Sequence, residues 1–331
     1  MTSQPLTAAD VIAKYRNGEK LTSQDLTGLD FAGQDLTGAD FTGSTLTRAA
    51  FRKAKLARAS LQNAVLTETD FAGADLSEAT LRDVQAVSAR FIRANLAQAD
   101  LTQGNFTDAD FTEANLAGAT LAGAVFARAR FVDAKATRAD APRTVFTGAD
   151  LTDADFTEAD LTDADLSATA LSYTTFLKAK GDGAVFCGAR GEKTTFGQSS
   201  FQGSRGDGET MIIDGRFNMV NLRGSQWKGA RLPRAQMVAA VLDGADFTGA
   251  DLMGSIILST TAKETCFQEA NLSEANLTQI DLAGGSLRRA DLTRTDLKMS
   301  NLAGVDFFEA KQAKTNLAGA DLIGTILSPQ S

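Results

Sequence analysis

The amino-acid sequence predicts an all-β solenoid, because one pattern of five residues recurs through nearly the whole chain. A large apolar residue, usually Leu or Phe, returns at every fifth position from Leu26 onward. A small residue, mostly Ala, stands two positions before it, as at Ala39 and Ala49. A period of five fits neither the helical period of about 3.6 nor the strand period of about 2. Two inward positions in five residues therefore require the chain to turn a corner in every unit.

Positions twenty residues apart indicate that four such units form one coil. Asp70, Arg90, Asp110, Arg130 and Asp150 each precede a large residue, and they alternate in sign. In coils stacked at the strand spacing of about 5 Å, this alternation replaces repulsion between like charges with attraction. Phenylalanines recur at the same spacing, and we expect their rings to stack as structural core: Phe31, Phe51, Phe71, Phe91, Phe111 and Phe131.

The repeated unit reads Ala-(Asp/Asn)-(Leu/Phe)-(Thr/Ser/Ala)-(Gly/polar), and it resembles the motif of the pentapeptide-repeat family over most of the chain. The resemblance implies a right-handed quadrilateral parallel β-helix, also called a pentapeptide-repeat solenoid, in which four units make one coil. Counting the units gives about 15 coils.

The first residues, 1–20, are predicted to form an N-terminal cap with a short helix at about residues 8–17. Thr7 is suited to the N-cap position, and Asp10 follows three residues later. Gly18 is suited to the position just after the helix. Since a solenoid exposes an unpaired edge at each end, we expect this helix to lie over the first coil.

The repeat shifts phase once, which predicts two blocks at 21–203 and 217–327 and a tail at 328–331. The intervening segment, 204–216, is predicted to be a phase break or a loop. Phe201 and Phe217 are sixteen positions apart, so one residue is inserted beyond three whole units.

Two stretches depart from the pattern. Ala136 and Ala141 replace two successive large residues, so we expect residues 132–145 to bulge outward as a loop. Gly181 and Gly191 occupy core positions, which leaves two interpretations of residues 181–215. These residues form either a slack, kinked coil or a surface loop that contacts a partner.

Composition argues against most kinds of active site. The chain has no His, which excludes a Ser-His-Asp triad, a Cys-His pair and imidazole metal ligands. A filled solenoid presents flat faces, whereas an enzyme needs a concave pocket. We therefore expect no enzyme activity, no cofactor and no small-molecule substrate.

Sequence features also indicate the cellular compartment. The two cysteines, Cys187 and Cys266, make no disulfide framework, and we expect both to be inert surface thiols of a cytoplasmic protein. No apolar run is long enough to span a membrane, and Met1–Pro5 do not resemble a secretory signal.

Two sets of charged residues are candidate partner-binding sites. The first is an acidic collar: Asp150, Asp153, Asp155, Glu158, Asp160, Asp163 and Asp165. The second is the possible loop that carries Arg205, Asp207, Glu209 and Asp214. The collar is interpreted as solvated surface, as a patch for a basic partner or as a weak divalent-cation site. The net charge of -8 argues against direct nucleic-acid binding.

These features predict a non-enzymatic scaffold or adaptor that binds another protein, as a monomer or a weak end-to-end dimer. The stretch Val11–Gly18 resembles the start of pentapeptide proteins that accompany bacterial contact-dependent secretion systems. That resemblance implies an adaptor associated with such a system. The alternative is a DNA mimic that binds a type II topoisomerase (DNA gyrase) and modulates its inhibitor sensitivity. The phase slip is similar to the hinge of those mimics, although their surfaces are more consistently acidic.

Overall fold

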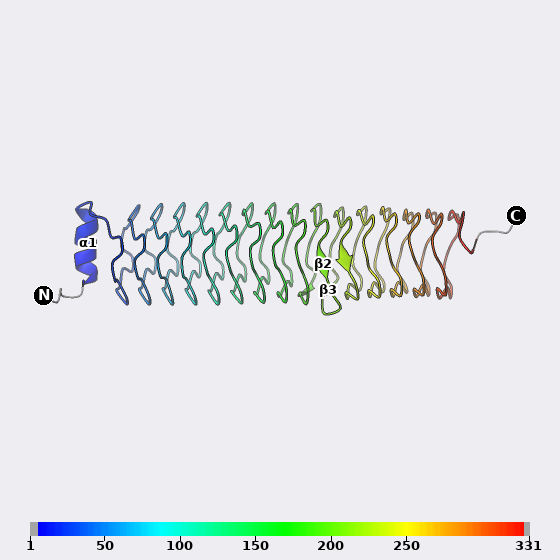
Figure 1. The fold of residues 1–331 in the computed structure, drawn as a ribbon, viewed down its shortest axis with the longest axis horizontal. Helices are drawn as coiled ribbons and strands as arrows, with labels where there is room; N and C mark the ends of the chain where they lie inside the picture. The colour runs from blue at the N-terminus through cyan, green and yellow to red at the C-terminus, as the bar shows by residue number, and fades with distance from the viewer. Residues whose placement is uncertain (1–5, 328–331) are drawn as a thin grey trace. The chain divides into compact units, whose positions relative to one another are not determined.

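The computed structural model describes residues 6–327, and the chain divides into two compact units, Met1–Asp160 and Leu161–Ser331. Each unit is a stack of coils (Figure 1). The segments Met1–Pro5 and 328–331 lie outside the described residues, and so do the predictions made for them. Within residues 6–327, no helix combines the length and the apolar character that a membrane crossing requires.

Parallel pairing sets a coil of twenty residues, as the charge alternation predicts. In the first unit, Asp70 pairs with Arg90, and Arg90 pairs with Asp110. Most pairs involve single residues, because the chain turns a corner every five residues. Four segments of the second unit are longer strands: β1 (Arg190–Glu192), β2 (Arg205–Gly206), β3 (Met211–Ile213) and β4 (Gln226–Trp227).

The unit from Asp100 to Gly104 shows why the five-residue consensus folds this way. The N–H groups of Leu101 and Gln103 donate to carbonyls of the next coil at 2.8 and 3.1 Å, and that of Asp100 donates to the previous coil at 2.9 Å. The Gly104 N–H closes the turn on the Leu101 carbonyl at 3.1 Å. The remaining donor, the Thr102 N–H, is accepted by Asp100 Oδ1 at 3.0 Å. In units of this kind, the Asp or Asn before the large residue therefore supplies the acceptor that the backbone lacks.

The turn between two sides places one residue of each unit in the left-handed backbone region. Gln103 has φ 58°, which a type II turn requires at its third residue. Residues other than glycine rarely adopt this backbone conformation, because it costs about 1–3 kcal/mol of conformational strain per residue. Here the hydrogen bonds of the neighbouring coils hold the backbone in place, so charged and polar residues recur at this position.

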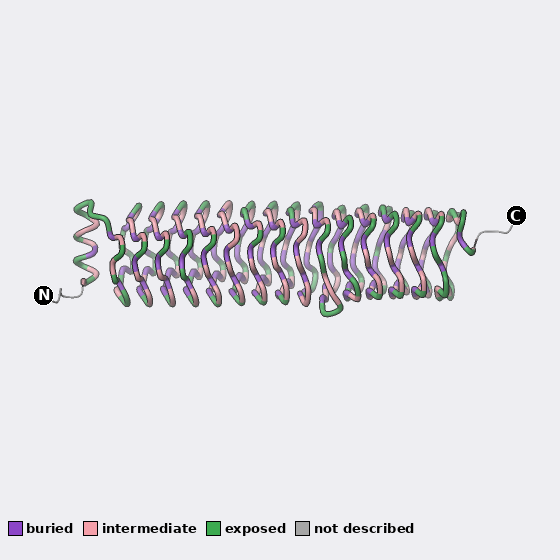
Figure 2. The backbone as a smooth tube through the Cα atoms, in the orientation of Figure 1, coloured by how far each residue is buried: buried purple, intermediate pink, exposed green. Residues whose placement is uncertain are grey.

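Buried positions recur at regular intervals along the coils of each unit (Figure 2), and the buried residues are alternately large and small. The expectation that residues 132–145 bulge outward is wrong. Ala136 and Ala141 are fully buried in coils of regular pattern. Phe156 stands one coil beyond Ala136 in the same column, and its ring centroid lies 6.5 Å from that of Phe131. Pro142 stands at the second position of a turn, where a fixed φ near -65° is favourable.

Helix α1 (Ala8–Arg16) forms the predicted cap of the first unit (Figure 1). Thr7 is its N-cap, and its Oγ1 accepts from the Asp10 N–H at 3.2 Å, while the Asp10 carboxylate accepts from the Thr7 N–H at 2.9 Å. Gly18 follows the helix with φ 76°. Val11 is buried, and the Tyr15 hydroxyl donates to the Thr37 carbonyl at 2.7 Å. These two contacts attach the helix to the first coils.

The phase shift is a single six-residue unit, residues 206–211. On its N-terminal side, residues pair at a spacing of twenty, as do Val185 and Arg205. Across it the spacing is twenty-one: β1 pairs with β3 through Arg190 and Met211, and β2 pairs with β4 through Gly206 and Trp227. The extra residue enlarges one turn and leaves the coils before and after it regular.

The glycines at core positions of the second unit make room for large neighbours. A Cβ on Gly181 would overlap the ring of Phe201, its partner one coil further along. A Cβ on Gly191 would stand 2.5 Å from Thr194 Oγ1. Residues 181–205 are therefore neither a long loop nor a slack coil, because larger side chains occupy the space that the glycines leave.

Candidate functional site

The interior of the first unit holds the six phenylalanines of the expected ring stack, all fully buried. Their successive ring centroids lie 4.7 to 5.2 Å apart. The rings of Phe106 and Phe126 pack edge-on against this column, with centroids 5.7 and 5.5 Å from the centroid of Phe111. Since apolar side chains occupy this interior, any function of the unit has to lie on its outward faces.

The acids of the collar divide by their position in the repeat. Within the first unit, Oδ1 of Asp150 and of Asp155 each accepts the backbone N–H two residues later, at 3.1 and 2.9 Å. Glu158, at a turn position, forms an ion pair with Arg138 at 2.8 Å. Asp153 is exposed at another turn position with φ 57°, and Asp160 precedes the boundary of the unit. Part of the collar therefore closes turns, and part projects into solvent.

The remaining two collar residues belong to the second unit. Asp165 Oδ1 accepts the Ser167 N–H at 2.9 Å, so it also closes a turn. Asp163 is exposed at a turn position with φ 56°. The described part of the chain contains no group of three or more acids or cysteines that could hold a metal ion. The use of the collar by a basic partner stays a prediction.

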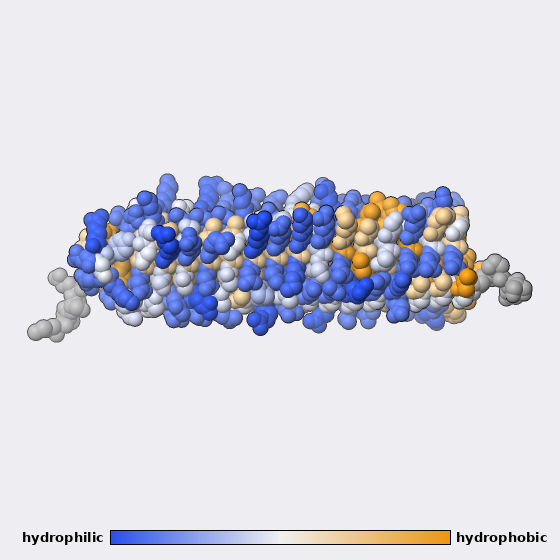
Figure 3. Space-filling model, turned by 90° about the horizontal axis from the view of Figure 1, so that it is seen from above, coloured by the Kyte–Doolittle hydropathy of each residue, from blue (hydrophilic) through white to orange (hydrophobic). Residues whose placement is uncertain are grey.

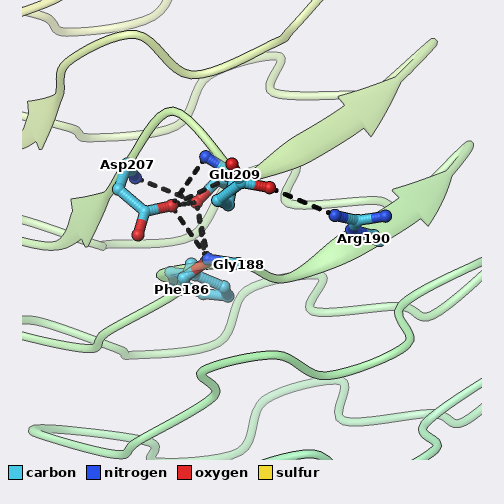
Figure 4. A network of polar contacts seen from close by, with 6 residues as sticks. Phe186, Gly188, Arg190, Asp207 and Glu209 are labelled. Atoms are coloured by element: carbon cyan, nitrogen blue, oxygen red, sulfur yellow. Dashed lines mark hydrogen bonds and ion pairs between the residues drawn. The ribbon is translucent and has the colours of Figure 1, made fainter.

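Asp207 organises the six-residue unit (Figure 4). Its Oδ1 accepts the backbone N–H groups of Gly188, Glu209 and Thr210 at 2.9, 3.1 and 3.0 Å. Its own N–H donates to the Thr210 hydroxyl at 2.9 Å, and that hydroxyl lies 2.9 Å from the Phe186 carbonyl. One carboxylate thus ties the enlarged turn to the preceding coil.

The other members of the predicted loop lie around this network. Glu209 forms an ion pair with Arg190 at 3.3 Å (Figure 4). Asp214 accepts two hydrogen bonds from Arg234 at 2.6 and 3.0 Å. Arg205 is exposed at the end of the preceding unit. The sequence grouped these residues by charge, but the structure shows that Asp207 and Asp214 stabilise the turn and the next coil.

Electrostatics at this turn favour ionised carboxylates and a protonated thiol. Burial opposes ionisation of Asp207, but the hydrogen bonds from Gly188 and Thr210 outweigh it and lower the pKa of Asp207. The guanidinium of Arg234 lowers the pKa of Asp214. Burial, followed by the negative charge of Asp207, raises the pKa of the half-buried Cys187 thiol, so it is a poor nucleophile at neutral pH.

Ion pairs between turn residues twenty positions apart are a feature that the sequence reasoning missed. In the first unit, Arg93 donates two hydrogen bonds to Glu113 at 2.8 Å each, and Arg128 does the same to Asp108 at 2.7 and 2.8 Å. The second unit repeats the arrangement, as at Arg294 and Glu274. Applying the twenty-residue spacing to the turn positions would have found these pairs.

Comparison with known proteins identifies repeats of one family in the chain. Two family models match: "Pentapeptide repeat region" over residues 54–131, and "Pentapeptide repeats (8 copies)" over residues 20–52, 129–167, 216–256 and 270–308. Together they cover more than half of the chain. No curated protein matches it.

Several solved structures are similar to the chain. HetL, a pentapeptide repeat protein involved in heterocyst differentiation regulation from the cyanobacterium Nostoc sp. strain PCC 7120, is 19% identical, over 96% of this chain and 97% of its own, with a TM-score of 0.22. Full-length QnrB1, a plasmid-mediated fluoroquinolone resistance protein, is 17% identical, over 64% of this chain and 92% of its own, with a TM-score of 0.24. A pentapeptide repeat protein from the thylakoid lumen of Arabidopsis thaliana is 38% identical, over 36% of this chain and 65% of its own, with a TM-score of 0.19.

The matched repeats are the five-residue units whose turns, bridges and inward residues the structure shows. Their geometry, four units to a coil of parallel pairs, is that of a right-handed quadrilateral β-helix. The chain belongs to the pentapeptide-repeat family.

Proposed function

We propose that this protein is a non-enzymatic scaffold that binds another protein on the outward faces of its coils. The observation that carries this proposal is the division of each unit: the inward positions are filled by buried side chains, and the outward positions stack in columns of side chains along each face. A surface held by a continuous backbone ladder loses little conformational freedom when a partner docks, which favours binding.

The same division leaves little support for catalysis. The carboxylate of Asp207 accepts three backbone hydrogen bonds from its own turn and the preceding coil, so its role is to stabilise the fold. The pKa of Cys187 is raised, which makes its thiol a poor nucleophile.

Support for a secretion component as the partner is the resemblance of Val11–Gly18 to the start of secretion-associated pentapeptide proteins. In the structure, this stretch provides the contacts of the cap, through Val11 and Tyr15. Those contacts explain the apolar residues of the stretch without a partner. The outward faces of the coils are therefore the proposed binding surface, and the following experiment is designed to identify the partner.

The test is photo-cross-linking in living cells from each of the four sides of one coil. Met253, Leu258, Lys263 and Gln268 hold the same outward position on successive sides. Each is replaced in turn by a photoreactive amino acid, and the adducts are identified by mass spectrometry. A scaffold gives one recurring protein adduct, concentrated on one or two sides. Equal labelling from all four sides, or no protein adduct, contradicts the proposal.

A supercoiling assay addresses the DNA-mimic alternative. DNA gyrase is titrated with the purified chain, with and without a quinolone inhibitor. Dose-dependent inhibition or protection supports the mimic, whereas no effect at micromolar protein favours a different partner. The ion pairs of the turn columns interleave cations with carboxylates, as at Arg93 and Glu113, whereas a DNA mimic is expected to be more consistently acidic.

A further inference from the structure

One side of the second unit carries no carboxylate over three successive coils. Its residues are 216–219, 236–239 and 256–259, which surround the buried Phe217, Met237 and Ile257. The pairs Arg216 with Gln236 and Gln236 with Ile256 place these segments in neighbouring coils. We call this side the aliphatic face. In a chain with a net charge of -8, its only ionisable side chain is the cation Arg216.

The aliphatic face exposes apolar side chains that touch solvent. Met219 is 55% exposed, and Ile256 is 39% exposed. On the same side, Val238 and Leu258 follow one another in one column, and Ala239 follows Met219 in the next. Figure 3 shows hydrophobic side chains gathered at the surface of the second unit. Contiguous apolar surface of this kind marks interaction sites more often than scattered apolar residues do.

Two backbone donors of this face have no acceptor within the described residues. Where an Asp or Asn precedes the large residue, its side chain accepts the N–H two positions later, as Asp246 does for Thr248. Here Arg216 and Ile256 occupy that position, and within residues 6–327 no hydrogen bond reaches the N–H of Asn218 or of Leu258. The N–H of Val238, in the coil between them, donates to Asn218 Oδ1 at 3.0 Å. Two backbone donors are thus available to an external acceptor.

The cation of the face is also unpaired. Most arginines of the second unit form ion pairs, such as Arg223 with Asp243 and Arg234 with Asp214. Among the residues that the structure describes, Arg216 contacts no carboxylate. The face therefore combines apolar surface, two free N–H donors and one free guanidinium, and it lacks any charged group that would attract a basic ligand.

We propose that the aliphatic face docks an apolar segment of a partner protein that carries carboxylate side chains. Aliphatic or aromatic residues of the segment pack on Met219, Val238, Ile256 and Leu258, and a carboxylate accepts from Arg216 and from the free backbone N–H groups. This inference rests on the proposed scaffold function and names the surface and the chemistry of the partner.

The experiment selects random short peptides, displayed on phage, against the immobilised full-length protein. Enriched peptides are synthesised, and their affinity is measured by fluorescence anisotropy. The test variant is Ile256→Lys with Leu258→Lys. Its matched control, Gln268→Lys with Ser286→Lys, adds the same two charges on the opposite side of the coils. Thermal unfolding followed by circular dichroism verifies that both variants fold.

The expected result is enrichment of peptides that combine apolar residues with Asp or Glu. Their affinity falls about tenfold or more in the test variant and changes little in the control. Arg216→Glu weakens the same peptides, and replacing their acids with Lys abolishes binding.

Three results would overturn the proposal. Peptides that bind the test variant as well as the control place the docking surface on another side, which leaves the scaffold function intact. Enrichment of basic peptides, or of none, refutes the assigned chemistry. Self-association that Ile256→Lys with Leu258→Lys disrupts, measured by analytical ultracentrifugation, assigns the face to a second copy of the chain. Failure of the scaffold function itself is read separately, from the absence of any cross-linked protein.

Discussion

The indole of Trp227 lies directly against the backbone of Gly206, its pairing partner across the six-residue unit. A Cβ on Gly206 would stand 2.7 Å from Trp227 Cε3. The ring also stacks on Phe186 with centroids 5.7 Å apart, and it is 1% exposed. Gly206 occupies a core position that a large residue fills elsewhere. The only tryptophan of the chain therefore fills the core at the point where one residue is inserted.

Replacing Gly206 with Ala should destabilise the second unit by about 1–3 kcal/mol, because the added methyl group overpacks a filled core. Trp227 reports the change, since its fluorescence arises at the contact itself. The free energy of unfolding is measured in urea by this signal. Gly208→Ala is the control, because a Cβ there meets only the Gly229 carbonyl at 3.9 Å. Equal effects of the two substitutions would mean that Trp227 does not lie over Gly206.

The inward and outward positions could be predicted from sequence because a period of five leaves an unambiguous apolar column. Phe91 and its partners are large, identical and evenly spaced, so the pattern predicts which positions face the interior. Residues 132–145 could not be placed this way. Ala136 and Ala141 stay buried in regular coils because the hydrogen-bonded ladder of the neighbouring coils holds the backbone in place, and that support is a tertiary property.

The role of the Asp before each large residue was interpreted as electrostatic, and the structure adds a local one. Asp100 accepts the N–H of Thr102, which is a hydrogen bond within one unit. The Asp-x-Thr spacing that carries it is visible in the sequence. The candidate sites were harder, because charge alone does not separate Asp207, which closes a turn, from Asp163, which is exposed at a turn position.

Replacing Asp207 with Ala should lower the free energy of unfolding by about 1–2 kcal/mol, since three backbone donors lose their acceptor and the site is partly screened by solvent. Asp207→Asn retains Oδ1 as an acceptor and should lose less. Urea denaturation monitored by Trp227 fluorescence measures both. A larger loss for Asn than for Ala would contradict the assigned hydrogen bonds.

The stability that Asp207 provides should depend on pH in a defined direction. Its pKa is lowered in the folded protein, so its contribution is complete above the ordinary pKa of about 4. That contribution is lost as the pH falls through the lowered folded-state pKa. The difference in unfolding free energy between the wild type and Asp207→Asn should therefore shrink below about pH 4. A difference that grows as the pH falls would reverse the sign of the shift.

Replacing Phe91 with Ala should cost about 3–5 kcal/mol, because the ring is fully buried and stacks between Phe71 and Phe111 at 5.1 and 4.7 Å. Thr102→Ala is the matched outward change, and it should stay within about 0.5 kcal/mol of the wild type. Thermal unfolding by circular dichroism gives both values. Similar losses at the two positions would show that the inward and outward assignments are wrong.

Replacing Tyr15 with Phe should loosen helix α1 and leave the coils intact. The substitution removes the hydrogen bond from the Tyr15 hydroxyl to the Thr37 carbonyl, worth about 1 kcal/mol, and keeps the ring. Hydrogen exchange followed by mass spectrometry should show faster uptake in residues 8–17 and unchanged uptake in the ring-stacked coils around Phe91. Lys14→Ala, on the same helix, is the control, because no hydrogen bond or ion pair of its side chain is lost within residues 6–327. Faster exchange throughout the first unit would mean that the helix holds the coils together, and unchanged exchange in the helix would mean that Val11 alone attaches it.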